Sequence, residues 1–161
     1  MIEDLNKLGK KLEIRAVEVR SKLDKKHRGS GNVGIAALTI ENSTKYLKAY
    51  SGYDEEIKGK TDGFVLLKES REFKTEFINN KNEIDYENGY DRKYDTESKL
   101  IEEIAILLGN SHKIEGRIDL YTDRIPCLSC MSVLKSFKKR YTEIKLFVYY
   151  KEVVNFEIKG E

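Results

Sequence analysis

The chain has little of several residue types whose abundance would define its class at once. It contains no tryptophan, one proline, two cysteines and two histidines in 161 residues. Two cysteines cannot build a disulfide framework, which excludes the small disulfide-stapled secreted domains. No apolar run approaches the roughly 20 residues of a membrane-spanning helix, so we expect no membrane association. The first residues, MIEDLNKLGKK, also lack the apolar segment of a secretory signal.

The chain also lacks a large excess of either positive or negative charge. Lysine and arginine number 30 against 28 acidic residues, and this net charge of +2 argues against a strongly basic coat for nucleic acid. Any such binding must come from a local patch. Ten tyrosines, six phenylalanines and 39% hydrophobic residues exclude a disordered chain. The length suits a single domain that buries its own core.

Residues 1–30 predict an amphipathic helix followed by a turn. Apolar residues recur there at steps of three and four, which places them on one helix face; they are Leu5, Leu8, Leu12, Ala16, Val19 and Leu23. Such a helix either packs on its own domain or is a linker from a larger parent protein. Residues 31–161 are expected to form the main domain.

The main domain predicts a layered α/β fold with a mixed sheet, in two or three layers. The expected elements are strands over 32–40 and 45–51, a helix from Thr96 that ends at Gly109, a strand over 117–121, a helix over 126–141, and strands over 144–150 and 153–158. Their order is β-β-α-β-α-β-β. The last two strands lie too close in sequence for a crossover, so they must form an antiparallel hairpin. Residues 52–94 read as a long, partly ordered surface excursion.

Two cysteines separated by two residues give the first chemical signal. In Pro126-Cys127-Leu128-Ser129-Cys130, both thiols belong to a first helical turn and can bind one ion at about 2.3 Å. The positive end of the helix favours the thiolate form, and Pro126 suits a first-turn position. A redox dithiol, or chance, would give the same spacing.

Glu97 gives the second signal. The residues one and two turns further along its face are apolar, so its carboxylate is expected to point toward the core. Burying an unpaired carboxylate is costly unless a charge or a metal compensates it. The alternative is a first-turn glutamate that the helix dipole stabilises while its head stays in water.

Together, Asp95-Thr96-Glu97 and the Pro126 segment resemble the signature of zinc-dependent nucleobase deaminases, H-x-E followed by P-C-x-x-C. The closer resemblance is to the deaminase domains of bacterial polymorphic toxins, which belong to the cytidine-deaminase-like superfamily. In these domains a D-x-E-x-K-L-like helix start and an L-x-T-x-x-x-P-C-x-S-C segment recur. Here they correspond to residues 95–100 and 120–130. The resemblance covers about residues 31–150 and implies a cytidine-deaminase-like fold.

The resemblance also implies a metal site, in which the usual first ligand is histidine. Asp95 occupies that position here. His112 lies past the far end of the Glu97 helix, on the order of 18 Å away along its axis, and His27 reads as a solvated residue at a helix end. By elimination Asp95 is the third Zn²⁺ ligand, with Cys127 and Cys130. Two thiolates and a carboxylate exceed the charge of the ion by one unit, so Glu97 would have to do more of the proton removal.

As function, the resemblance implies hydrolytic deamination of cytosine in nucleic acid or nucleotides, with Glu97 as the catalytic proton carrier. The chain would be the effector domain of a larger exported toxin, acting in the cytoplasm of the target cell and neutralised by a cognate immunity protein. Asn32 matches the asparagine that contacts the sugar in free cytidine deaminases, and Pro126 and Tyr121 complete the expected substrate contacts. Tyr121 offers either a stacking face or sheet packing. Two alternatives remain. The first is a non-catalytic nucleic-acid- or protein-binding module with structural zinc, and the second is a redox dithiol protein.

Overall fold

A mixed sheet organises the protein, whose computed structural model describes residues 2–150 and 154–160. The strand order across the sheet is β2 (Ser43–Tyr50), β1 (Val33–Ile40), β5 (Gly116–Thr122), β6 (Ile144–Tyr150) and β7 (Val154–Ile158). Only β5 and β6 pair in parallel. β6 and β7 pair antiparallel, which confirms the predicted terminal hairpin, although the turn and Val153 lie outside the described residues.

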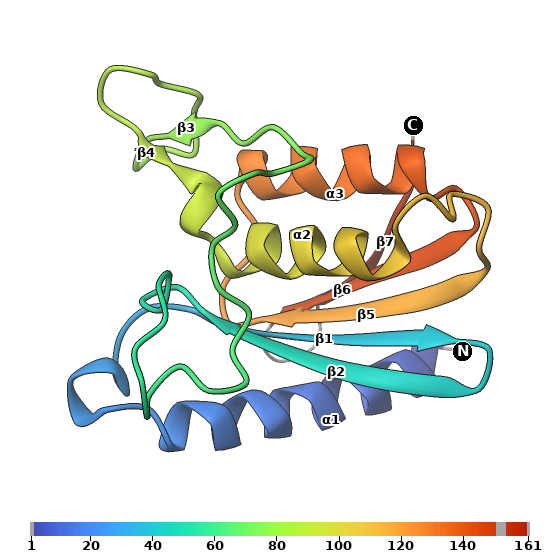
Figure 1. The fold of residues 1–161 in the computed structure, drawn as a ribbon, viewed down its shortest axis with the longest axis horizontal. Helices are drawn as coiled ribbons and strands as arrows, with labels where there is room; N and C mark the ends of the chain where they lie inside the picture. Colours follow the sequence, from blue (N-terminus) through green and yellow to red (C-terminus); the bar gives the residue numbers. More distant parts are fainter. Residues whose placement is uncertain (1, 151–153, 161) are drawn as a thin grey trace.

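Helices cover both faces of this sheet, which makes the fold a three-layer α/β arrangement (Figure 1). α1 (Ile2–Ser21) lies on one face, and α2 (Thr96–Leu108) and α3 (Leu128–Arg140) lie on the other. The predicted stripe meets the sheet: Leu12 and Ala16 of α1, and Leu23 just beyond its end, are buried in one cluster with residues of β1. The N-terminal helix therefore packs on its own domain.

The structure contains two short strands that the sequence analysis did not predict. β3 (Phe77–Ile78) and β4 (Tyr90–Asp91) form a separate two-stranded sheet within the predicted excursion, and short 3-10 turns occupy Lys25–His27 and Arg92–Tyr94. Two-residue strands are too short to produce a readable alternation, which is why the sequence pattern missed them.

The excursion over residues 52–94 is held by buried polar side chains of α2. Lys99 Nζ donates to the carbonyl oxygens of Tyr50 and Tyr53 at 2.9 and 3.0 Å. The two carboxylate oxygens of Glu102 accept from the backbone N–H groups of Glu72 and Phe73 at 2.7 and 2.9 Å. The long connection is thus attached to the helix that begins beside Asp95.

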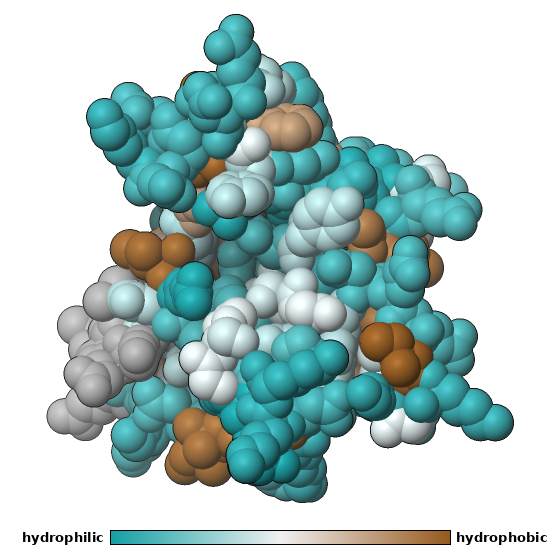
Figure 2. All heavy atoms as spheres, turned by 90° about the vertical axis from the view of Figure 1, so that its left-hand side faces the viewer, coloured by the Kyte–Doolittle hydropathy of each residue, from teal (hydrophilic) through white to brown (hydrophobic). Residues whose placement is uncertain are grey.

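The ends of two strands and two helices lie together at one edge of the molecule. The start of β1, the end of β5 and the first turns of α2 and α3 all lie at the left of Figure 1. Figure 2 looks straight at this edge, whose surface is mainly hydrophilic with isolated apolar side chains. Among the described residues, no helix combines the length and the apolar character that crossing a bilayer requires.

Candidate functional site

Asp95, Cys127 and Cys130 meet at this edge. Their ligand atoms all lie within 4.8 Å of one another. The Cys130 thiol donates to Asp95 Oδ2 at 3.2 Å, and the Cys127 thiol reaches the same oxygen at 3.5 Å. Two sulfurs and one carboxylate oxygen at this spacing are a donor set that Zn²⁺ accepts, and three protein ligands leave one position open. The residues therefore fit the ion that the sequence predicts.

Helix starts explain how these side chains come together. Asp95 and Cys127 are the N-cap residues of α2 and α3, and their carbonyl oxygens accept the first helical bonds from Lys99 N and Met131 N at 3.1 and 2.9 Å. An N-cap side chain usually turns back to bond its own helix. Neither of these does so. Both side chains are therefore available to face each other across the gap between the two helices.

Hydrogen bonds and neighbouring charges act differently on the members of this cluster. The hydrogen bond with Cys130 lowers the pKa of the Cys127 thiol despite its partial burial. The same bond, together with full burial, raises the pKa of Cys130 well above its usual value. Arg92 Nη1 lies 3.5 Å from Asp95 Oδ1. This guanidinium offsets the surplus negative charge that two thiolates and a carboxylate would place around a divalent ion.

Glu97 lies in the interior beside this cluster, with 2% of its surface exposed. Its Oε1 accepts three hydrogen bonds, from Thr96 Oγ1 at 2.7 Å, Thr122 Oγ1 at 2.9 Å and Asn32 Nδ2 at 3.0 Å. Burial raises the pKa of the Glu97 carboxyl, and the charge of Asp95 raises it further. The carboxylate therefore points inward, as the apolar face of its helix predicts. Three donors fix one of its oxygens: one from α2, one from β5 and one from the residue directly before β1.

Asn32 is engaged at both ends of its amide. Its Nδ2 donates to Glu97, and its Oδ1 accepts from Asp123 N at 2.9 Å. Asp123 Oδ2 in turn forms an ion pair with Arg20 of α1 at 2.7 Å. The residue that we expected to contact a sugar is therefore directed at the glutamate.

The other expected residues lie in different places. Pro126 is buried directly before Cys127. Tyr121 is 3% exposed and packs with Tyr149 in the cluster under α1, on the opposite face of the sheet from α2, so the structure does not bring it to Glu97. His27 is half-buried with its ring against Tyr50, so its prediction as a solvated residue was wrong.

Sequence reasoning gave no role to several polar residues that build the site. Thr96 and Thr122 hold Glu97, Lys99 and Glu102 hold the excursion, and Ser129 accepts from Glu76 N at 2.8 Å. All five are buried. Thr122 and Lys99 stand within the two motifs, so their positions were a usable signal, but their partners lie far away in sequence.

Comparison with known proteins gives one match. A family model named Toxin-deaminase, described as the BURPS668_1122 family of deaminases, matches residues 16–152. No curated protein and no solved structure matches the chain.

Proposed function

Because this chain belongs to the Toxin-deaminase family, we propose that it is a zinc-dependent hydrolase that converts cytosine to uracil in nucleic acid or nucleotides. Membership supplies the toxin and deaminase character. The observation that carries the finer proposal is a buried glutamate with one fixed carboxylate oxygen beside an Asp-Cys-Cys cluster. This combination suits the removal of an amino group by water.

In this proposal Asp95, Cys127 and Cys130 hold the zinc ion. When bound, the ion would supply Lewis-acid activation of a water molecule for attack on the ring. Three ligands from two helix starts leave an open side for that water and the substrate. Arg92 balances the charge of the ligand set, so the aspartate can serve where histidine is usual.

Glu97 carries the protons. It takes one proton from the attacking water and delivers it to N3 of the cytosine ring. It then takes the second proton, from the hydroxyl group now on C4, and delivers it to the amino group, which leaves as ammonia while the C4 carbonyl forms. The raised pKa of Glu97 suits this exchange, because a carboxyl group with the ordinary pKa of a solvent-exposed glutamate would hold the transferred proton too weakly.

The two carboxylate oxygens of Glu97 differ in their contacts, and we propose that they have different roles. Oε1 is held by Asn32, Thr96 and Thr122, which leaves Oε2 to exchange protons. A carboxylate held in one orientation needs little rearrangement between successive proton transfers. We assign Asn32 to positioning Glu97, and we keep Pro126 as a substrate contact because it adjoins Cys127.

The biological setting follows from the toxin membership. We propose that the domain is exported as part of a larger toxin, acts in the cytoplasm of the target cell, and is neutralised at home by a cognate immunity protein.

The test combines metal analysis with sequencing. The purified chain should contain about one zinc per molecule, Asp95→Ala should lose most of it, and Glu97→Gln should keep it. DNA and RNA from bacteria that express the parent should show C-to-T or C-to-U changes, whereas Glu97→Gln should give the background level.

Each negative result has a distinct meaning. Equal mutation loads from parent and Glu97→Gln would reject the deaminase mechanism and favour a binding module with structural zinc. Metal-free, folded protein with a Cys127–Cys130 disulfide would reject the metal site itself.

A further inference from the structure

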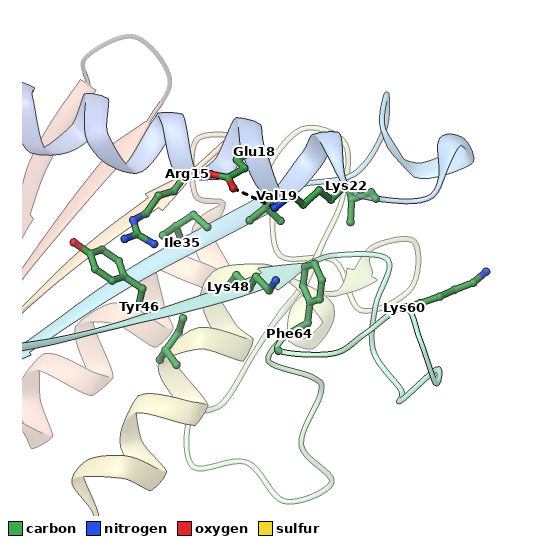
Figure 3. A pocket seen from close by; sticks show the side chains of 12 residues that line it. Arg15, Glu18, Val19, Lys22, Ile35, Tyr46, Lys48, Lys60 and Phe64 are labelled. Carbon is green, nitrogen blue, oxygen red and sulfur yellow. Dashed lines mark hydrogen bonds and ion pairs between the residues drawn. The ribbon is translucent and has the colours of Figure 1, made fainter.

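The two halves of the excursion lie against different parts of the fold. In the first half, Phe64 forms part of the wall of a pocket between α1 and β2, where Lys48 Nζ lies 4.5 Å from the centre of its ring (Figure 3). The second half includes the β3–β4 hairpin, which lies at the same edge as the first turns of α2 and α3 (Figure 1). We call residues 76–92 the β3–β4 segment. This segment is the part of the excursion that lies near the Asp-Cys-Cys cluster.

The two residues between the cysteines hold the β3–β4 segment on α3. Ser129 is fully buried, and its Oγ accepts from Glu76 N at 2.8 Å. Leu128 N donates to Oδ1 of Asn82 at 3.1 Å. Cys127, the N-cap of α3, makes no capping bond with its own side chain. Asn82 therefore supplies an acceptor for one of the N–H groups that a helix start leaves without a partner.

Glu76 also connects α3 to Asp95. Its carbonyl oxygen accepts from Arg92 N at 3.1 Å, and the carbonyl oxygen of Arg92 accepts from Asp95 N at 3.1 Å. The backbone of Glu76 thus bonds the first turn of α3 through its N–H and the residues before α2 through its C=O. Asp95 and Cys127 are 32 residues apart in the chain. Glu76 and Arg92 complete a short path of hydrogen bonds between their two helix starts.

Arg92 also contacts the side chain of Asp95. Its Nη1 lies 3.5 Å from Oδ1 of Asp95, whereas the thiols of both cysteines lie near Oδ2. One carboxylate oxygen therefore faces the guanidinium while the other faces the sulfurs. Partners on the outer side of a metal ligand orient that ligand, and their loss typically weakens metal binding by roughly 10- to 100-fold.

The β3–β4 segment is held in shape by its own contacts. Ile78, which pairs with Tyr90, is 1% exposed. A β-carbon on Gly89 would stand 2.5 Å from the carbonyl oxygen of Asp85, a closeness that only glycine allows. Asn82 has φ +58°, a conformation that asparagine adopts more readily than most residues. A segment built in this way can fix the position of Asp95 relative to α3.

We propose that the β3–β4 segment sets the zinc affinity of the cluster, with Ser129 and Arg92 as positioning residues that hold Asp95 opposite the cysteines before the ion binds. The proposal rests on the proposed function in one respect, since it takes Asp95, Cys127 and Cys130 as the ligands of Zn²⁺. Ligands that are already in place lose less conformational freedom when the ion binds.

The experiment measures the dissociation constant of Zn²⁺ for the full chain, first freed of metal, by competition with a chromogenic chelator. Ser129→Ala should weaken zinc binding by roughly 10- to 100-fold. In the Asp95→Ala background the same change should alter the constant by less than about threefold, because no carboxylate is left to position. Ser132→Ala, at an exposed position of α3, is the matched control and should leave zinc binding unchanged.

Arg92→Gln gives a second test, in which charge and positioning predict opposite signs. Removal of a positive charge beside the cluster would by itself strengthen the binding of a cation. Loss of the contact with Asp95 Oδ1 should instead weaken zinc binding by roughly tenfold or more, and this is the result that we expect. Lys93→Gln removes the same charge from the neighbouring residue and should not weaken zinc binding.

Three results would overturn this proposal and leave the proposed function in place. The first is zinc binding by Ser129→Ala as tight as that of the parent. The second is an equal loss from Ser129→Ala with and without Asp95, which would show a general effect on α3. The third is zinc binding by Arg92→Gln at least as tight as that of Lys93→Gln. Should Ser129→Ala fail to fold, the comparison of Arg92→Gln with Lys93→Gln decides the proposal.

Failure of the proposed function has a different signature. A parent chain that binds no zinc, or that binds it equally well as Asp95→Ala, would reject the ligand set and the positioning role together. Because the affinity is measured without turnover, the expected zinc constants in a chain that deaminates no cytosine would reject the reaction alone and support the positioning role.

Discussion

The first two turns of α2 and the whole of α1 are buried in different ways. Every residue from Thr96 to Glu102 is at most 2% exposed, and three of these seven residues carry charged groups: Glu97, Lys99 and Glu102. α1 buries one apolar stripe and leaves even large apolar residues of its outer face in water, such as Val17 at 64% exposure. α1 follows the usual pattern of a surface helix, and α2 breaks it.

The difference shows what each helix does for the fold. Burial of charge costs stability unless each group has its partners. On α2 each of the three buried charged groups has a hydrogen-bond partner in a strand or in the excursion, so the helix organises the site and the excursion at once. On α1 the apolar contacts stabilise the sheet and carry no chemistry. Substitutions in the two helices should therefore separate activity from stability.

The largest expected effect is on turnover. Glu97→Gln should lower the rate of deamination by roughly 10² to 10⁴-fold or more, because it removes the carboxyl group that we propose as the proton carrier. Zinc content should be kept, and the thermal midpoint should hold or rise, because a buried charge is removed. The control is Glu103→Gln in the same helix, which makes the same chemical change at a carboxylate that pairs with Lys68 of the excursion; its turnover should stay at the parental level. If Glu97→Gln failed to fold, the glutamate would be needed for stability, and the proposed difference between α2 and α1 would be wrong.

The next effect is on stability alone. Leu12 is fully buried under the sheet, so Leu12→Ala should lower the free energy of unfolding by about 2–5 kcal/mol through lost burial and a cavity. Urea unfolding measures this change, and Val17→Ala on the exposed face should stay within about 0.5 kcal/mol of the parent. Zinc content and turnover of the folded fraction should not change. A lower turnover in folded Leu12→Ala would show that α1 takes part in the site.

A smaller loss of stability is expected on α2. Lys99→Met removes the Nζ donor from the carbonyl oxygens of Tyr50 and Tyr53 and breaks the 2.6 Å ion pair with Asp54, at a cost of about 2–3 kcal/mol. Lys11→Met, at an exposed position of α1, should cost less than about 0.5 kcal/mol. Proteolysis of the excursion should also become faster in Lys99→Met. Equal stability of the two variants would mean that the excursion does not depend on α2.

The smallest effect tests the donors on Glu97. Thr122→Val removes one of three hydrogen bonds to Oε1 and should reduce turnover about tenfold, the value of one hydrogen bond to a charged group. Thr122→Ser keeps the hydroxyl and should restore most of the rate. Zinc content should be the same in both variants. A rate in Thr122→Val equal to that of the parent would show that the other two donors suffice.

Local patterns in the sequence predicted the elements well, for a physical reason. The stripe on α1, the helix from Thr96 and the strand over 117–121 each depend on apolar periodicity within one segment. The Asp95, Cys127 and Cys130 cluster was predicted in another way, from the resemblance to deaminase motifs, and the structure brings these three residues together. Family membership from residue 16 to 152 agrees with the resemblance that these motifs predicted.

Long-range contacts could not be predicted in this way. Lys99 is buried only because the carbonyl oxygens of residues 50 and 53 come to it, and nothing near Lys99 in sequence indicates this. Tyr121 and Thr122 are neighbours on a strand, so they point to opposite faces of the sheet. Alternation alone did not show which of the two faces Glu97. The partner of Asn32 likewise required the pairing of β1 with β5.

The pairing of β1 with β5 also sets when the protein becomes active during folding. It joins Gly34 to Thr122 across the excursion and the whole of α2. Closing so long a stretch of chain is slow in comparison with the local β1–β2 hairpin, which forms in roughly microseconds. Asn32, Glu97 and Thr122 come together only at that closure. A chain in which this long-range pairing has not yet formed therefore carries no assembled site, although its local hairpin and helices can already be present.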